Sequence, residues 1–537
     1  MLFNSPTFIL LFLPLTLLGF FLLGAKGWRR AAIAWLVFAS AVFYAWFRAD
    51  YLLVLAVLVV FNYLYGIKLS RDYQLHQSRL GWLAIGIAVN LGVLAYFKYT
   101  NFFVDNVNVL FGTNFVLQKI ILPIGISFFT FQKIAYLVDA YRGEAEEYDF
   151  LDFSLFVMYF PQLIAGPITH HKEIIPQFRQ ASILRLSLVD LAAGLTLFAI
   201  GLFKKVVIAD QVVLWSDTVF AAAAGGAPLS FLESWGGALA FTFQIYFDFS
   251  GYTDMALGLA LMIGIRLPLN FNSPYKATSI IDFWRRWHMT LSRFLRDYVY
   301  IALGGNRRGP LRRYINLMAT MLIGGLWHGA AWTFVVWGGL HGIYLVINHG
   351  WHALRDRFGL TRPSSTWSRG VARLLTFVAV VLAWVFFRAE SFQAARVVLD
   401  GMTAINGVGL PAHYAEYLGS LAQVLRNLGV SFNDAMLVYS YGWPEAVGLL
   451  VLLLMVWFTP NSQELLARFR PALTVCEPAR CAALFRRVAI RLRLAAPDGS
   501  FALTPATGLL VGATLLGGLL YQAIRTTTLH PFIYFQF

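Results

Sequence analysis

The chain has 537 residues, of which 59% are hydrophobic and only 13% are charged. Soluble domains average about 25% charged residues, so water is excluded as the main solvent of this protein. The net charge of +15 would favour nucleic-acid binding in a soluble protein, but here the basic residues cluster in short segments between apolar runs. That distribution is typical of membrane proteins, so we expect membrane lipid around the chain and no nucleic acid as a partner.

Uncharged apolar runs follow one another from the start of the chain, at 8–24, 31–47, 51–67 and 81–97. Each is close to the roughly 20 residues with which a helix crosses a bilayer. The seven residues before the first run include no Lys or Arg, and further runs follow at once. We therefore predict an uncleaved first span rather than a signal peptide.

Basic residues follow the first and the third apolar runs. By the positive-inside rule, both connecting loops lie in the cytoplasm, which places the amino terminus in the periplasm. We expect a multi-pass protein of a bacterial inner membrane. The residues that carry this assignment are Lys26, Arg29, Arg30, Lys68, Arg71 and Arg79.

Further apolar segments predict an all-α polytopic bundle of about 11 to 13 membrane segments. The piece from Phe160 to Pro167 is apolar but too short and too rich in Pro and Gly to span, so we expect it to be re-entrant or interfacial and to line a cavity. The other predicted spans lie near 120–138, 187–208, 234–247, 314–347, 374–387, 446–459 and 506–524.

Two stretches, 389–445 and 468–493, have mixed or basic composition and are predicted to be extramembrane insertions. Neither stretch approaches the roughly 100 to 150 residues of a soluble catalytic domain. We therefore expect residues 1–537 to form a single membrane domain. Cys476 and Cys481 are the only cysteines and have no histidine close by in sequence. We expect no disulfide framework, no metal site and no cysteine nucleophile.

The segment 244–348 is predicted to be the catalytic core. It begins with an aromatic frame that holds Asp248 and Asp254. A carboxylate at membrane depth is unfavourable by about 2.5 to 3.5 kcal/mol, so both should face a wet cavity or a partner.

Arginines dominate the next part of this segment, with eight from Arg285 to Arg313 against the single acidic residue Asp297. Helical spacing predicts that Trp284, His288 and Ser292 share one face. Arginine binds phosphate with two parallel hydrogen bonds, so a phosphorylated donor such as a coenzyme could dock here. The alternative is that the cluster only anchors the chain to anionic lipid.

His328 lies between glycines in an apolar run far from any Lys or Arg. It is either a buried imidazole hydrogen-bonded between helices or a general base that takes a proton from an acceptor hydroxyl. His341 follows 13 residues later, which in a continuous helix places it on nearly the opposite face. His170 and His171 are expected at the membrane interface.

Four motifs together resemble the membrane-bound O-acyltransferases, in the bacterial branch that contains alginate O-acetyltransferase and the teichoic acid D-alanylation acyltransferase. They are Phe160–Pro167 with its Phe-Pro-Gln-Leu-Ile-Ala-Gly-Pro, Tyr246–Tyr252 with Tyr-Phe-Asp-Phe-Ser-Gly-Tyr, Phe283–His288 with Phe-Trp-Arg-Arg-Trp-His, and Gly324–Gly329 with Gly-Gly-Leu-Trp-His-Gly.

This resemblance implies a bundle with a central tunnel, in which His328 is the essential catalytic histidine and His288 the second active-site histidine. Donor or acceptor binding is expected from residues of the same motifs and their surroundings. These are Trp284, Arg285, Arg286, Trp287, Asp248, Ser250, Tyr252, Asn272 and Trp327.

The family further implies transfer of an acetyl group from a cytoplasmic thioester, acetyl-CoA, toward a hydroxyl of an exopolysaccharide such as alginate or cellulose, with no bound cofactor. The chain has no Gly-Asp-Ser hydrolase signature, so we expect a periplasmic SGNH-type acetyltransferase partner and association with polysaccharide synthesis and secretion machinery. Two alternatives remain at this stage, transfer of D-alanine to a cell-wall polymer, and a transporter with a proton path through Asp248, Asp254, His328 and His341.

Overall fold

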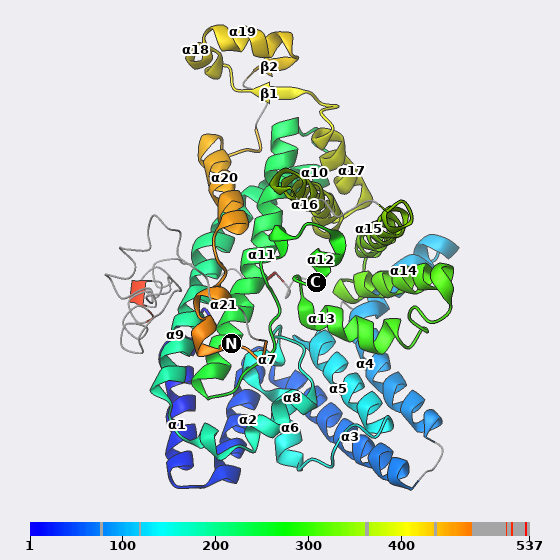
Figure 1. Cartoon of the computed structure of the whole chain (residues 1–537), viewed down its shortest axis with the longest axis vertical. Helices are drawn as coiled ribbons and strands as arrows, with labels where there is room; N and C mark the ends of the chain where they lie inside the picture. Colours follow the sequence, from blue (N-terminus) through cyan, green and yellow to red (C-terminus); the bar gives the residue numbers. More distant parts are fainter. Residues whose placement is uncertain are drawn as a thin grey trace.

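The computed structural model describes residues 1–75, 79–116, 120–359, 365–433, 438–474, 512, 517–518 and 532–533. Within these residues the chain is almost entirely helical (Figure 1). The two strands found there, β1 (Val408–Leu410) and β2 (Val430–Phe432), form one short parallel pair. The predicted all-α class is therefore confirmed.

The amino-terminal helices pack side by side in one part of the molecule (Figure 1). A short π-helical turn precedes α1. The elements are η1 (Phe8–Phe12), α1 (Leu13–Ala25), α2 (Arg29–Ala45), α3 (Ala49–Gln74), α4 (Leu80–Phe111) and α5 (Ile126–Tyr141).

The middle of the chain begins with short, buried helices and continues with two long ones. The predicted interruption near Pro161 is confirmed, because α7 is a single turn whose four residues are all buried. The elements are α6 (Phe150–Met158), α7 (Phe160–Leu163), α8 (His171–Phe178), η2 (Ala181–Leu184), α9 (Leu188–Phe203), η3 (Lys204–Ala209), α10 (Asp210–Ala224) and α11 (Phe231–Met262).

The remaining elements include the predicted catalytic core and the insertion at 389–445. Strands β1 and β2 with α18 and α19 project from one end of the molecule (Figure 1). The elements are η4 (Pro274–Lys276), α12 (Ile280–Trp284), α13 (Met289–Phe294), η5 (Leu295–Tyr300), α14 (Gly309–His328), α15 (Trp332–Arg357), α16 (Thr366–Arg388), α17 (Phe392–Met402), α18 (Tyr414–Leu418), α19 (Ser420–Asn427), α20 (Trp443–Phe458), α21 (Ser462–Leu465) and η6 (Ala467–Phe469).

Five helices among the described residues are long and apolar enough to cross a membrane, and the apolar helix α20 is shorter. The five are 8–25, 49–74, 80–111, 188–224 and 366–388, and each contains one of the predicted spans. The predicted total of 11 to 13 segments stays a prediction, and the span near 506–524 and the cysteines lie outside the described residues.

Helices α9 and α11 approach each other through glycines. A Cβ atom on Gly194 would lie 2.6 Å from the carbonyl oxygen of Gly258, and one on Gly201 would lie 2.5 Å from that of Gly251. Small residues seven apart on both helices thus allow backbone contact, as is common between membrane helices. This contact fixes α11, which carries one wall of the candidate site.

The carboxylates of Asp248 and Asp254 on α11 both have lysine partners. Lys205 lies 2.6 Å from Asp248, and Lys204 lies 2.6 Å from Asp254. Consecutive lysines reach the same helix because they begin the π-helical turn η3, which widens the helix locally. The expectation of a partner for each buried carboxylate is confirmed.

Helices α14 and α15 also cross at glycines. A Cβ atom on Gly325 would lie 2.3 Å from the carbonyl oxygen of Phe334, and one on Gly338 would lie 2.3 Å from that of Met321. Neighbouring Gly339 is different, because its added Cβ would meet only a leucine methyl group at 3.6 Å. The close crossing therefore depends on Gly338 and not on Gly339.

We expect Gly338→Ala to destabilise the protein by about 1 to 3 kcal/mol, because the methyl group must push α15 away from α14. Gly339→Ala is the matched control and should be neutral or slightly stabilising, since alanine favours the helix by about 1 kcal/mol. Thermal unfolding of the purified protein in detergent measures both. Equal midpoints for the two variants would contradict the close crossing.

Candidate active site

Helix α14 ends at His328, in the middle of the run that looked continuous in the sequence. Gly329 is extended, with φ −159° and ψ 151°, and α15 begins only at Trp332. The prediction that 314–347 is one helical run is therefore wrong. A helix end inside the protein leaves carbonyl oxygens that need donors.

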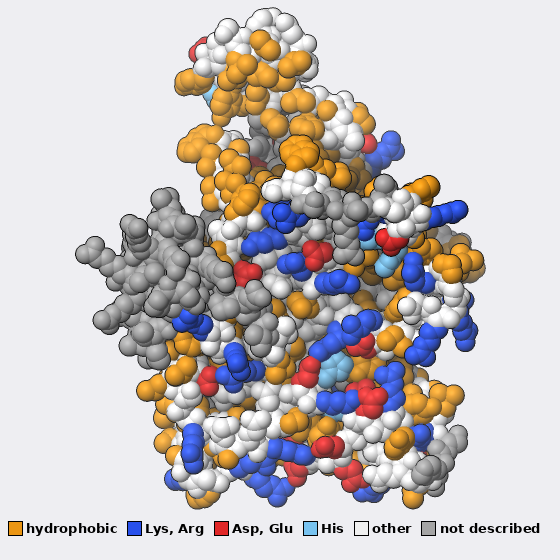
Figure 2. Space-filling view, viewed as in Figure 1, with side chains coloured by type: hydrophobic (Ala, Val, Ile, Leu, Met, Phe, Trp, Pro, Cys, Tyr) orange, Lys and Arg blue, Asp and Glu red, His pale blue; other side chains and the backbone are white. Residues whose placement is uncertain are grey.

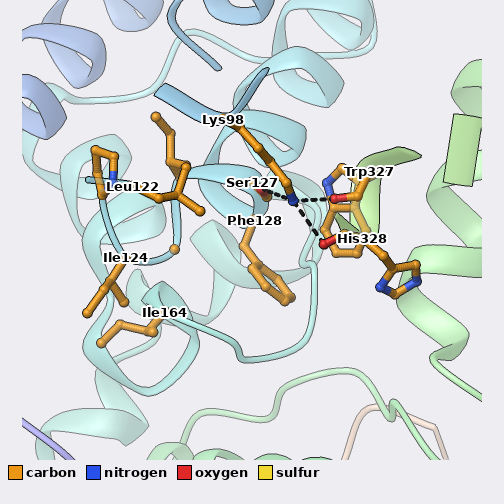
Figure 3. A pocket seen from close by; sticks show the side chains of 11 residues that line it. Lys98, Leu122, Ile124, Ser127, Phe128, Ile164, Trp327 and His328 are labelled. Carbon is orange, nitrogen blue, oxygen red and sulfur yellow. Dashed lines mark hydrogen bonds between the residues drawn. The ribbon is translucent and has the colours of Figure 1, made fainter. Parts of the chain in front are cut away.

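Lys98 of α4 supplies those donors. Its ammonium lies 2.5 Å from the carbonyl oxygen of Trp327, 3.1 Å from that of His328 and 3.4 Å from the hydroxyl of Ser127 (Figure 3). The hydroxyl of Tyr99, the next residue, donates to the carbonyl of Leu326 at 2.8 Å. A cation at a helix carboxyl end is favourable because it also faces the negative end of the helix dipole.

His288 has an unusual backbone conformation. Helix α12 ends at Trp284, and His288 precedes α13 with φ +42°, in the left-handed region. The predicted single helical face with Trp284, His288 and Ser292 is therefore wrong, because the helix breaks between the first two residues. A left-handed histidine is rare and is held only where the surroundings demand it.

Those surroundings are the extended segment at Asn270. The Met289 amide donates to the carbonyl of Asn270, and the Asn272 amide donates to the carbonyl of Arg286, both at 2.9 Å. The ring nitrogen Nδ1 of His288 lies 3.0 Å from the side-chain oxygen of Asn270. Backbone and side-chain contacts together therefore hold the His288 ring in place.

The two predicted catalytic histidines lie together. Their ring centroids are 6.3 Å apart, at an interplanar angle of 65°. Both are buried, with exposures of 0% for His288 and 4% for His328. They lie 40 positions apart in sequence, His288 directly before α13 and His328 at the end of α14, and the breaks in α12–α13 and α14–α15 allow the two rings to meet.

Aromatic rings enclose this pair. His328 contacts Trp337 and Phe387 at centroid distances of 5.0 and 5.3 Å, and Phe249 of α11 contacts His288 at 4.9 Å. Predicted site residue Trp327 lies 4.9 Å from the His328 ring and 6.0 Å from that of His288. Such an enclosure excludes water from the rings.

His341 lies closer to the site than the sequence predicted. Its ring is 4.8 Å from Trp337, which in turn contacts His328. The predicted opposite face assumed a continuous helix, and the break at Gly329 removes that assumption. Nδ1 of His341 lies 3.3 Å from the indole nitrogen of Trp284, so His341 holds that side chain.

A cavity of about 560 Å³ lies on the arginine-rich side of the histidines. Predicted residues Trp284 and Arg285 line it, as do Thr290, Arg293 and Arg296. In the view of Figure 2, lysine and arginine side chains gather across the middle and lower part of the molecule, whereas apolar side chains dominate the projecting end. The cavity has the size and charge to hold a phosphorylated group.

A second cavity of about 50 Å³ touches Lys98, Ser127, Trp327 and His328, together with Ile164 from the broken segment (Figure 3). The predicted cavity beside that segment is confirmed. The imidazole of His328 points from the cavity wall away from Lys98 (Figure 3). The two cavities share no lining residue, so the continuous tunnel stays a prediction.

The two cavities lie toward different ends of the bundle. The smaller one includes Ile124, whose carbonyl accepts from Tyr44 at the end of α2. Arg29 begins α2 at the opposite end and donates to the carbonyl of Phe178 on α8. Helix α8 also carries Glu173, which pairs with Arg293 of the larger cavity. The larger cavity therefore faces the end with the predicted cytoplasmic loops.

Several predicted binding residues lie elsewhere. Arg286 pairs with Asp282 at 2.8 Å, and the side chain of Asn272 accepts from Asn461 at 3.1 Å. Neither residue lines either cavity. Trp287 is buried against Phe283, with ring centroids 5.6 Å apart.

The predicted residues on α11 have packing roles in the described part of the chain. Asp248 accepts from the amide of Ile533 at 2.7 Å in addition to its contact with Lys205. Tyr252 packs on Phe3, with centroids 4.8 Å apart. Ser250 is buried, and neither cavity includes it, Asp248 or Tyr252.

His170 and His171, predicted at the interface, belong to a polar cluster beside the larger cavity. His171 is buried and contacts Asp139 at 3.0 Å and Tyr148 at 2.8 Å. His170 contacts Tyr298 at 3.3 Å, and burial, together with the charge of Arg293, lowers the pKa of His170. The cluster braces α8 against the chain after α13.

Sequence reasoning missed Lys98, Asn270 and Thr290. The one signal for Lys98 was a cation placed directly after an apolar run, which also fits a residue at a span end. Asn270 stands two positions before Asn272, and positions two apart on a regular extended segment share a face. The chain bends at Asn272, so Asn270 contacts His288 whereas Asn272 contacts Asn461. Asn270 is therefore the asparagine that contacts His288, and a binding role for Asn272 stays a prediction.

The model of the membrane-bound O-acyltransferase family matches residues 7–387, which include both histidines. A peptidoglycan O-acetyltransferase of Helicobacter pylori is 46% identical over 436 residues, 76% of this chain and 81% of the relative. A probable alginate O-acetylase of Pseudomonas aeruginosa is 44% identical over 408 residues, 75% of each chain. A teichoic acid D-alanyltransferase of Streptococcus thermophilus is 28% identical over 288 residues, 50% of this chain and 69% of the relative.

We expect Lys98→Met to loosen the end of α14, because buried carbonyls that lose a donor are destabilised by about 1 to 3 kcal/mol. Hydrogen exchange of peptides that cover 325–331 should speed up. Lys26→Met, at an exposed loop, is the control and should leave this exchange unchanged. Identical exchange in both variants would mean that Lys98 does not hold the helix end.

Proposed function

We propose that this chain, which belongs to the membrane-bound O-acyltransferase family, moves an acetyl group from a thioester donor toward hydroxyl groups of an extracytoplasmic polysaccharide. Membership makes the chain a multi-pass membrane acyltransferase. The observation that carries the proposal is the buried histidine pair, approached by an arginine-lined cavity from one end and a smaller cavity from the other.

The choice of acetyl as the group rests on the relatives. Those at 46% and 44% identity are an O-acetyltransferase and a probable O-acetylase, whereas the D-alanyltransferase is 28% identical and matches half of this chain. The acceptors named for the first two, peptidoglycan and alginate, are both polysaccharides with free hydroxyls. Alginate and peptidoglycan are therefore the acceptors to test first, followed by cellulose, which only the motif resemblance suggested.

For the donor, acetyl-CoA in the larger cavity is the best-supported candidate. A coenzyme carries several phosphates, and Arg285, Arg293 and Arg296 line a space of about 560 Å³ that can accept them. The thioester would then point toward Trp284 and Thr290, on the side of the histidines. In the predicted orientation of the chain in a bacterial inner membrane, this donor reaches the cavity from the cytoplasm.

In the proposed reaction, His328 acts as general base. Its neutral ring takes the proton of the acceptor hydroxyl while that oxygen attacks the acetyl carbon, and the carbon–sulfur bond then breaks. The proton passes from the imidazolium to the departing thiolate, so that thiol and acetyl ester are formed. A positioned base contributes about 10² to 10⁴-fold to the rate, and the aromatic enclosure prevents hydrolysis by excluding water.

His288 would orient the acetyl group or carry it for a moment as an acyl-imidazole. Direct transfer and the covalent relay both fit two rings 6.3 Å apart. Final placement on the polymer is proposed to involve a periplasmic SGNH-type acetyltransferase and the polysaccharide synthesis and secretion machinery.

Three of the four residues of the transporter alternative have fixed partners in the described part of the chain. Asp248 and Asp254 are held by Lys205 and Lys204, and His341 is held by Trp284. A proton path needs groups that change partners, and these groups are in fixed pairs between packed helices.

Replacing His328 with alanine tests the proposal directly. We expect acetylation of the polysaccharide to fall by about 10² to 10⁴-fold because the base is lost. His413→Ala, at an exposed histidine of the insertion, is the control and should retain activity. Membrane insertion is checked for both, and undiminished acetylation by correctly inserted His328→Ala would refute the role of the base.

Substitutions of Arg285 and Arg286 distinguish a role in donor binding from a role in packing. Arg285→Ala should raise the KM for acetyl-CoA by about 10- to 100-fold, because an arginine hydrogen bond to a charged group contributes about 1.5 to 3 kcal/mol. Arg286→Ala should raise the KM less and lower the thermal midpoint instead, since Arg286 pairs with Asp282. Equal KM values for the two variants would contradict a donor site in the larger cavity.

A further inference from the structure

We propose that Asn270 is a positioning residue, which fixes the protonation pattern of the His288 ring so that Nδ1 carries the proton and Nε2 offers its lone pair to the reacting groups. Nothing in the motifs marks Asn270, which becomes visible only through its contacts. The inference rests on the proposed function, because it assigns the oriented Nε2 of His288 to acyl transfer.

The first step of the argument is the identity of the asparagine atom that faces His288. The backbone amide of Thr290 points at this atom from 3.4 Å, and the hydroxyl of Thr290 lies 3.0 Å from it. A backbone N–H can only donate, so its partner must be an acceptor, which in asparagine is the amide oxygen. The amide of Asn270 is thereby fixed in one of its two orientations.

Thr290 adds a second constraint on that orientation. Its hydroxyl oxygen already accepts a hydrogen bond from the backbone amide of Ile168 at 3.0 Å. The hydroxyl proton is therefore directed to the Asn270 oxygen. A chain of donors, from Ile168 through Thr290, thus converges on one buried oxygen, and such chains strengthen one another in a low-dielectric interior.

The second step concerns His288 itself. Its Nδ1 lies 3.0 Å from the same oxygen, and both side chains are fully buried, with exposures of 0%. An unprotonated nitrogen cannot bond to an oxygen that only accepts, so Nδ1 must carry the proton. In a neutral imidazole the other nitrogen, Nε2, then has the lone pair.

The third step is rigidity. The two backbone hydrogen bonds that join 270–272 to 286–289 are both 2.9 Å long, and His288 is in the left-handed conformation with φ +42°. This clamp fixes the backbone of His288 beside Asn270, and turning the ring to present Nδ1 would break its hydrogen bond to the Asn270 oxygen. Thr290 lines the larger cavity, so the clamp lies between the proposed donor site and the ring.

Two substitutions of Asn270 test the inference in the full-length protein. Asn270→Leu removes the acceptor, so the tautomer of His288 is no longer fixed. We expect kcat to fall by about 10² to 10⁴-fold, because loss of tautomer control lowers kcat to a similar extent in serine proteases. The KM for acetyl-CoA should stay within about twofold of the parent value. Asn270→Asp keeps an acceptor oxygen, so kcat should stay within about tenfold of the parent. The acid limb of the pH–rate profile of Asn270→Asp should move to higher pH, because a carboxylate stabilises the imidazolium of His288.

A readout independent of activity is the ¹⁵N NMR spectrum of the histidine-labelled protein in detergent, with the His288 signals identified by their absence in His288→Gln. Parent and Asn270→Asp should show a protonated Nδ1 at neutral pH, and Asn270→Leu should lose that pattern. Asn62→Leu is the control for loss of a buried asparagine, because Asn62 is also 0% exposed but bonds to Asn90 on α4.

Three results would overturn the inference. The first is a protonated Nδ1 in Asn270→Leu, and the second is a kcat in Asn270→Asp as low as in Asn270→Leu with no shift of the acid limb. The third is a changed tautomer with full kcat. In that last case a loss of activity in His328→Ala would leave the proposed function standing, so the two failures are distinguishable. If Asn270→Leu does not fold, the acid limb of Asn270→Asp still decides.

Discussion

The site depends on one partly buried cation, the ammonium of Lys98, which binds the last carbonyls of α14. A helix that ends inside a membrane protein leaves acceptors that lipid cannot satisfy, so α14 can stop at His328 only because α4 supplies the donor. This contact joins the amino-terminal helices to the core segment 244–348. It also separates α14 from α15, and the separation lets His341 and Trp337 fold back toward the His328 ring.

Interruptions of regular helix build the rest of the site. The break before His288, the single turn of α7 and the π-helical turn that carries Lys204 and Lys205 each turn a side chain or a backbone amide toward the interior. Each interruption has its compensation close by, in Asn270, Thr290 or a carboxylate of α11. Irregular backbone is tolerated in a membrane protein where protein groups satisfy it.

The charges divide into two classes with different physical roles. Lys204, Lys205, Asp248 and Asp254 are buried and paired, so they hold helices and are removed from chemistry. Arg285, Arg293 and Arg296 line a large cavity, where Arg293 also pairs with Glu173 and Arg296 with Asp297. Between these classes lies an uncharged enclosure of aromatic rings around two histidines, where a proton can move without competition from water.

The sequence by itself determined the membrane class, the helical architecture and the long amino-terminal spans, because hydropathy is a local signal. Its motifs also singled out His288 and His328, whose catalytic roles stay a prediction. It also indicated a broken segment near Pro161 that borders a cavity. Tertiary structure decided where α14 stops, that Asn270 rather than Asn272 meets His288, and that Arg285 lines the cavity while Arg286 does not. These outcomes depend on contacts between residues far apart in the chain, such as Lys98 with Trp327, 229 positions away. No periodicity within one segment carries that information.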